Sequence, residues 1–269
     1  MLRLVWKRLL QLIPTMLIVV SITFVITRVI PGDPVSVLAG PEADPQVIAE
    51  LQASLGLDKS IPEQFVMYVS DICRGDFGTS LNYNEPVFSL ILDRIPKTLL
   101  ITFTGLIIAL VGGIVLGTVS ALRQNSIIDH LCTFFALLGA SMPVFWIAIM
   151  SIFVFSVQLG LLPVMGMGSL DQGIGDVASH MLLPCLCLAL APMATFTRTT
   201  RSSMLDTINN DYIRALRARG VKERRIIWKH AFKNALPPII SILGVQLGIS
   251  FSGAIMTENI FSWPGMGTL

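Results

Sequence analysis

Cysteine and histidine are the residues of this 269-residue chain whose chemistry could hold a metal or supply a nucleophile. Cys185 and Cys187 have a Cys-x-Cys spacing, but both lie in an apolar run, where small packing residues are the better interpretation. The histidines stand far apart, and no motif indicates a Ser/His/Asp or Cys/His set. We therefore expect no metal site, no catalytic residues and no cofactor.

Nucleotide chemistry is equally unsupported by the sequence. The chain has no G-x-x-x-x-G-K-[ST] phosphate loop, so we expect that it does not bind ATP itself and is not an enzyme. The net charge is only +2, which gives no indication of nucleic acid as a partner. The charge is concentrated instead, because ten of the 19 basic residues lie between Arg198 and Lys233.

Composition places the chain in the membrane class. It is 53% hydrophobic and 13% charged, with a mean hydropathy of +0.73, which leaves too few charges for a soluble surface. A helix needs about 20 apolar residues to cross a bilayer. Five runs are long enough, and they predict an all-α integral membrane protein with five transmembrane helices: 9–30, 98–122, 131–159, 181–197 and 237–257. We interpret the first run as an uncleaved span.

The loop charges predict an orientation. The N-terminus holds three bases and no acid, residues 31–97 hold ten acids and four bases, and residues 160–180 hold two acids and no base. Residues 198–233 hold ten bases and three acids. Since Lys and Arg mark the cytoplasmic side, the N-terminus and the basic stretch are predicted inside, and 31–97, 160–180 and the tail outside.

The outer segment and the apolar runs carry smaller local signals. Residues 45–55 have helical spacing, and "CRGDFGTSL" is typical of turns, so we expect a small cap outside the membrane. Gly113-x-x-x-Gly117 and Gly244-x-x-x-Gly248 are candidate helix-contact faces. Phe145 and Trp146, beside a proline, could line a path, but core packing is the preferred interpretation.

The basic stretch is predicted to form a helix, a glycine turn and a second helix. Residues 211–219 place Ile213 and Leu216 on one face, and Gly220 suits the position after a helix C-terminus. The second helix, 222–235, is expected to end at a Leu-Pro-Pro sequence. An amphipathic helix of this kind suits docking into a groove on another protein or lying on anionic lipid, and spacing alone does not separate the two.

"DYIRALRARG", followed by a Leu-Pro pair, resembles the cytoplasmic EAA loop of ABC importer permeases. Gly220 and Ala215 match that pattern. Arg214 replaces its Glu, Leu216 replaces its second Ala, and the Leu-Pro pair comes four residues late. The peptide-permease branch fits better, and seven further stretches resemble it in the right order: "RVIPGDP", "LGLDKSIPEQF", "GDFGTSL", "PVFW", "LGLLP", "RSSMLD" and "FSWPGMG".

This resemblance implies a permease of the dipeptide, oligopeptide, glutathione or nickel type in a bacterial or archaeal cytoplasmic membrane. Its implied partners are a second homologous permease, two ATP-binding subunits that hydrolyse ATP, an extracytoplasmic solute-binding protein and membrane lipid. Residues 209–222 would carry the mechanical coupling. The implied coupling residues are Asp211, Tyr212, Arg214, Ala215, Arg217, Ala218 and Gly220.

The resulting domain scheme is an anchor at 1–30, an extracytoplasmic segment at 31–97 and a permease core at 98–269, with the coupling loop at 198–236. Such permeases have six spans, so we expect that the sequence stops before the last one. An ion-coupled secondary transporter or a non-transporting scaffold is the alternative; the former would usually place an ionisable residue in mid-span. The solute and the path-lining residues are left open.

Overall fold

The computed structural model of the chain describes residues 2–29, 44, 46, 52–53, 56–80 and 82–269. Within these ranges the chain is helical, apart from turns and one isolated antiparallel bridge between Thr79 and Pro86. The predicted all-α fold is confirmed. The chain divides into two compact units, Met1–Leu90 and Ile91–Leu269, and each has its own packing.

The first unit contains α1 (Leu2–Val29) and α4 (Ile61–Arg74). α1 includes the predicted first span, and its segment Trp6–Thr27 is long and apolar enough to cross a membrane. Phe24 is buried against Phe65 and Tyr68 of α4, with ring centroids 5.3 and 5.7 Å apart. Most other described side chains of α1 are exposed, which suits a helix surrounded by lipid.

The ends of α4 follow from its sequence. Glu63 accepts hydrogen bonds from the Ser60 hydroxyl and backbone N–H at 2.9 and 3.1 Å, and the hydroxyl bond lowers the pKa of Glu63. The helix ends at Gly75, which has a φ of 78° that favours glycine. The turn predicted from "CRGDFGTSL" is thus confirmed, whereas most of the predicted helix 45–55 lies outside the described residues.

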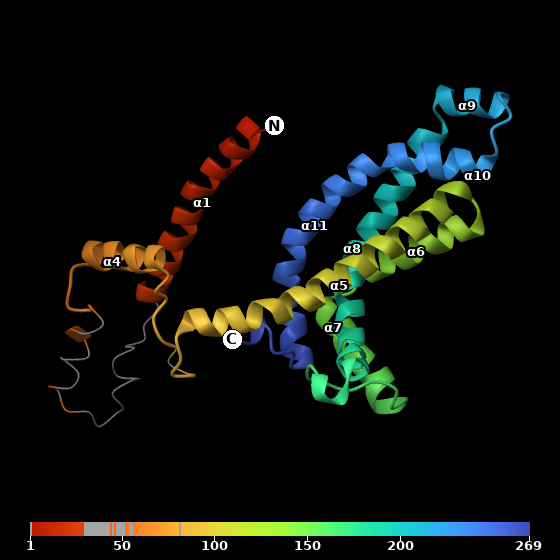
Figure 1. Cartoon of the computed structure of the whole chain (residues 1–269). Helices are drawn as coiled ribbons and strands as arrows, with labels where there is room; N and C mark the ends of the chain where they lie inside the picture. The colour runs from red at the N-terminus through yellow and green to blue at the C-terminus, as the bar shows by residue number, and fades with distance from the viewer. Residues whose placement is uncertain (1, 30–43, 45, 47–51, 54–55, 81) are drawn as a thin grey trace. The chain divides into compact units, whose positions relative to one another are not determined.

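The second unit is built on three long helices. They are α5 (Val87–Leu122), which starts before the predicted span, α8 (Ile174–Ile208), and a continuous helix, Glu223–Phe261. α8 is central, because it packs against both α11 (Phe232–Phe261), which forms most of that continuous helix, and α6 (Ile127–Ser141) (Figure 1). Together with α1, these make four described helices long and apolar enough to cross a membrane, and a bent helix pair makes up to five.

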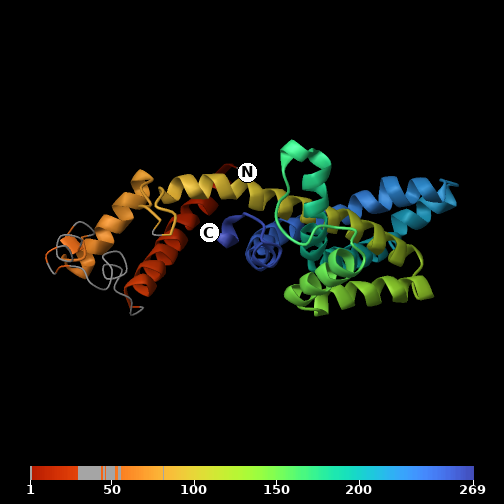
Figure 2. The same cartoon turned by 90° about the horizontal axis from the view of Figure 1, so that it is seen from below.

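The bent pair interrupts the third predicted span. α6 (Ile127–Ser141) is followed by α7 (Val144–Ser151) and the π-helical η1 (Ile152–Gln158), and the two halves meet at 101° (Figures 1 and 2). The cause is local. Pro143 has no N–H to donate, and Met142 before it is extended, with φ −82° and ψ 134°. The apolar run therefore forms a broken span or a re-entrant element instead of a straight helix.

The predicted end of the second basic-stretch helix near residue 235 is wrong. α10 (Glu223–Arg225), the π-helical η3 (Ile226–Ala231) and α11 (Phe232–Phe261) form one helix of 39 residues that runs through Pro237 and Pro238. Spanning helices tolerate proline where neighbouring elements support them. Ala235 and Ile239, on either side of the prolines, are buried in apolar clusters, which holds this segment in place.

Small residues let α5 and α8 approach closely. A Cβ at Gly113 would collide with Phe196, and one at Gly117 would lie 2.5 Å from the Thr197 carbonyl oxygen. This pair is the helix-contact face that the sequence predicted. The other pair, Gly244 and Gly248, meets no described atom within 4 Å.

Candidate functional site

The predicted docking helix is present as α9 (Asp211–Ala218), which links the end of α8 to α10 (Figure 1). Its C-terminus has both hydrogen bonds of a Schellman motif. The N–H of Gly220 donates to the Arg217 carbonyl at 2.9 Å, and the N–H of Val221 donates to the Leu216 carbonyl at 3.2 Å. Gly220 has a φ of 73°, which explains why glycine stands there.

An apolar seat fixes α9 to the rest of the unit. Ile213 is fully buried, and it packs in one cluster with Ala121 of α5, Met204 of α8, and Ile226 and Ala231 of η3. The predicted apolar face of Ile213 and Leu216 is therefore confirmed, because Leu216 lies at the edge of the same cluster. A helix held by three other elements can move with them as one body.

The opposite face of α9 is open. All seven predicted coupling residues are exposed: Asp211, Tyr212, Arg214, Ala215, Arg217, Ala218 and Gly220. Ala215 and Ala218 are small and exposed, and Asp211, Arg214 and Arg217 are exposed charged residues of the same helix. Small residues permit close approach of another macromolecule, and charges at the rim of such a contact give specificity.

Two side-chain contacts stiffen the loop, and neither was predicted. Arg217 forms a two-point ion pair with Glu223, at 2.7 and 3.2 Å, and this hydrogen bonding raises the pKa of Arg217. The Tyr212 hydroxyl accepts a hydrogen bond from the Asn234 amide at 2.8 Å. The spacing of these residues fits no helical i,i+4 rule, so local pattern reasoning could not detect them.

A polar cluster joins α5, α6 and α8, and its Arg201 lies shortly before α9 in the sequence. Arg201 donates to both carboxylate oxygens of Asp129, each at 2.7 Å, and Asp129 is buried. The Ser120 hydroxyl and the Asn125 N–H also donate to this carboxylate. Asp129 and Arg201 come from different helices, so no local spacing predicted their pairing, which ties α6 to α8.

A second buried carboxylate lies at the other end of the long helix. Glu258 has no exposed surface, and it accepts hydrogen bonds from the Thr98 hydroxyl and the Gly267 N–H, both at 2.5 Å. A Cβ at Gly265 would collide with the Glu258 carboxylate, which explains this glycine. Thr98 and Glu258 lie on different helices, so the sequence pattern did not predict this contact.

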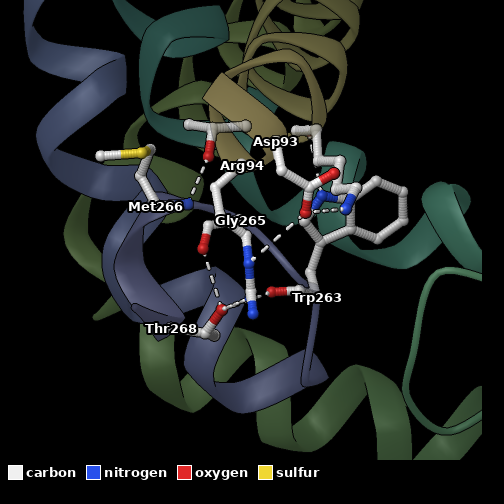
Figure 3. Close-up of polar contacts among 8 residues, drawn as sticks. Asp93, Arg94, Trp263, Gly265, Met266 and Thr268 are labelled. Atoms are coloured by element: carbon white, nitrogen blue, oxygen red, sulfur yellow. Dashed lines mark hydrogen bonds and ion pairs between the residues drawn. The ribbon is translucent and has the colours of Figure 1, made fainter. Parts of the chain in front are cut away.

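The segment after Phe261 folds back against α5 beside Arg94 (Figure 3). Trp263 is fully buried, and its indole N–H donates to the Lys97 carbonyl at 3.0 Å. The Met266 N–H donates to the Thr98 hydroxyl at 2.8 Å, and Arg94 donates to the Thr268 hydroxyl at 3.1 Å. We call residues 258–268 the C-terminal clasp; it ends in the 3₁₀ turn η4 (Met266–Thr268).

The remaining candidate residues are placed as follows. Cys185 and Cys187 are buried in two apolar clusters, which agrees with the packing interpretation. In the described part of the chain, no three His, Cys, Asp or Glu side chains gather as a metal site would need. Phe145 and Trp146 are not core residues as preferred, because both are nearly half exposed and Trp146 lines an apolar cavity.

Comparisons with known proteins agree with this geometry. Residues 113–269 match the family model of the binding-protein-dependent transport system inner membrane component, and residues 1–102 match the model of its N-terminal part. The chain is 40% identical to the dipeptide transport system permease protein DppB of Alkalihalophilus pseudofirmus, over 97% of this chain and 84% of that protein. It is also 40% identical to the glutathione transport system permease protein GsiC of Salmonella typhimurium, over 100% of this chain and 85% of that protein.

Solved structures support the same fold. The inward-facing MetNI methionine ABC transporter superposes with a TM-score of 0.54 at 19% identity, covering 68% of this chain and 80% of the matched chain. Because the family models and the 40% identical relatives together span nearly the whole sequence, the chain belongs to the binding-protein-dependent ABC importer permeases, the inner-membrane components of these transport systems.

Proposed function

We propose that this importer permease moves peptides or similar small solutes that an extracytoplasmic binding protein delivers. The relatives named for dipeptide and glutathione transport support this solute class, because each is 40% identical over nearly the whole chain. Both solutes are short, flexible and rich in amide groups. A nickel chelate is the competing cargo, and the choice among them is a matter for transport assays.

Coupling is assigned to α9, which docks on an ATP-binding partner subunit. The observation that carries this assignment is that Ile213 of α9 is buried, whereas every predicted coupling residue of α9 and of the turn after it is exposed. ATP binding moves the partner subunits, α9 moves with them, and its apolar seat transmits the motion to α5, α8 and the long helix. ATP hydrolysis takes place on the partners.

The working assembly is a pair of similar permeases with two ATP-binding subunits in a bacterial or archaeal cytoplasmic membrane. The charge alternation supports an inside N-terminus and α9, with 31–97 outside. In a cysteine-free background, cysteines at Asp58 and Asp171, both exposed, should react with an impermeant thiol reagent in sealed cells. A cysteine at Asn209 should not react, and its labelling would overturn this orientation.

Transport itself is tested by reconstitution in liposomes with candidate ATP-binding subunits and a candidate solute-binding protein. We expect uptake of a labelled dipeptide or of glutathione that needs both ATP and the binding protein. ATP-dependent uptake of a nickel chelate, with no peptide or glutathione uptake, would contradict the proposed solute class. Uptake driven by an ion gradient without ATP would contradict the coupling scheme.

A further inference from the structure

Two cavities are lined by both α6 and α8, and they differ in chemistry; α7 and η1 also line the apolar one. One cavity, of about 350 Å³, is lined by polar side chains, and we call it the polar pocket. Its lining residues are Asn125, Asp129, His130, Thr133, Thr197, Arg198 and Arg201. The other, of about 450 Å³, is called the apolar cavity, and its lining includes Phe135, Leu138, Gly139, Leu190 and Met193. Thr197 lines both, so the two are neighbours along the same helix pair.

The positions of the two cavities along α6 and α8 match the positions of the headgroup and the acyl chain of a lipid in a bilayer. On α8, Arg198 directly follows the apolar run 181–197, and on α6, His130 directly precedes the apolar run that starts at residue 131. The polar pocket therefore lies at the level where both helices leave the apolar layer. Leu190 and Arg201 are eleven positions apart, about 16 Å at the helical rise. One leaflet of hydrocarbon is of similar depth, about 15 Å.

The polar pocket has unused positive charge. Asp129 is its one carboxylate, and that group already accepts bonds from Arg201, Ser120 and Asn125. Arg201 uses Nε and Nη2 for this pair, which leaves further N–H groups of its guanidinium free to donate. Arg198 is exposed and forms no ion pair with any carboxylate in the described ranges. The pocket is thus complementary to an anion.

We propose that an anionic phospholipid binds here, with its phosphate headgroup in the polar pocket and one acyl chain in the apolar cavity. The two chemistries, their order along α6 and α8 and their spacing all fit one amphipathic ligand. Basic pockets between transmembrane helices bind anionic headgroups through charge-assisted hydrogen bonds, and arginine suits the phosphate geometry. The bound lipid bridges α6 and α8, and α8 leads directly into α9. This proposal is independent of which solute is transported.

The test uses the full chain and native mass spectrometry with phosphatidylglycerol or phosphatidylcholine of matched chain length. We expect one tightly retained phosphatidylglycerol per chain and weaker retention of phosphatidylcholine. Arg198→Gln should weaken phosphatidylglycerol binding about 10-fold, because one charge-assisted contact is lost. The matched control, Arg219→Gln, removes the same charge from an exposed site outside both cavities and should leave the affinity unchanged.

A second variant tests the acyl chain. A Cβ at Gly139 would make ordinary contacts with Leu190 at 3.6 Å, so Gly139→Leu is tolerated by the backbone while it narrows the apolar cavity. It should weaken binding of long-chain phosphatidylglycerol and leave the dihexanoyl form unchanged. Equal effects of the two arginine variants would overturn the proposal, as would no effect of Gly139→Leu on long-chain binding.

Two further readouts identify other occupants. Displacement of phosphatidylglycerol by millimolar inorganic phosphate would show that the pocket binds any phosphate anion and does not recognise the acyl chain. A photo-reactive residue at Leu138 should form adducts with lipid in native membranes. Adducts with another protein chain instead of lipid would show that a partner covers the apolar cavity, and either result would overturn the proposal.

Discussion

The helix Glu223–Phe261 has an irregular segment at each end, and the two segments differ in where their polar groups lie. At its start, the α9 loop anchors itself with an apolar residue, Ile213, and exposes its charges. At its end, the C-terminal clasp buries a carboxylate, Glu258, and an indole, Trp263, in hydrogen bonds. The α9 loop therefore keeps an exposed polar surface, whereas the polar groups of the clasp are hydrogen-bonded to other residues of the chain.

The two segments are therefore expected to differ in function, because one exposes its polar groups and the other buries them. Replacing an exposed polar group costs little stability. Removing one partner of a buried hydrogen bond costs more, because the remaining donor or acceptor is left unsatisfied. Changes in the clasp should therefore act on folding, and changes on the open face of α9 should act on coupling. The predictions below separate the two regions by that criterion.

Glu258→Ala should have the largest effect. It leaves the Gly267 N–H and the Thr98 hydroxyl without their acceptor in a buried site, at a cost of about 3 kcal/mol of stability. Thermal unfolding of the purified chain in detergent measures this loss. Asp171→Ala, at an exposed carboxylate, is the matched control and should unfold like the wild type. Equal stability of both variants would show that the clasp is not a structural brace.

Ile213→Ala tests the seat of α9. Truncating this fully buried side chain should cost about 2 kcal/mol or more locally, because it leaves a cavity in the cluster with Met204 and Ile226. Hydrogen exchange should rise over residues 211–220 and stay unchanged in the clasp. A uniform rise across both regions would contradict the separation between them.

Ala215→Glu tests the open face without disturbing the seat, since Ala215 is exposed. A new charge would be desolvated in the interface with the ATP-binding subunit, so ATP-driven uptake should fall about 10-fold or more. Membrane abundance of the chain should not change. Ala178→Glu introduces the same charge at an exposed alanine of α8 and is the control. Normal uptake by Ala215→Glu would favour the interpretation of α9 as a helix that lies on anionic lipid.

Arg217→Gln should have the smallest effect on stability. Arg217 and Glu223 are both substantially exposed, and exposed pairs contribute roughly 0.5 kcal/mol. The melting temperature should therefore change little, and coupling should weaken only if Arg217 also contacts the partner. A loss of several degrees would show that this ion pair is a structural element comparable to the Glu258 cluster.

The sequence predicted the features that depend on residues close to one another in the chain. Apolar runs located the long helices, and the spacing of Ile213 and Leu216, with Gly220 behind them, located α9 and its end. These features are readable because helix periodicity and glycine at positive φ act over a few residues. The open face of α9 followed from the same pattern.

Contacts between distant residues were not predictable in this way. Asp129 and Arg201 are 72 positions apart, and Thr98 and Glu258 are 160 apart, so no local spacing joins them. The expected helix end before Pro237 was wrong because packing of Ala235 and Ile239 outweighs the missing donor. Tertiary packing decided each of these features, and a single sequence does not display it.

The most direct test of the central claim is disulfide or bifunctional cross-linking from a cysteine at Ala215, in a cysteine-free chain co-expressed with its ATP-binding subunits. Ala215 is exposed and lies at the centre of the open face of α9. We predict a cross-link to the ATP-binding subunit whose yield changes when ATP is bound, while a cysteine at Ala178 gives none. Absence of any such cross-link in an assembled, ATP-hydrolysing complex would contradict the assignment of α9 as the coupling surface.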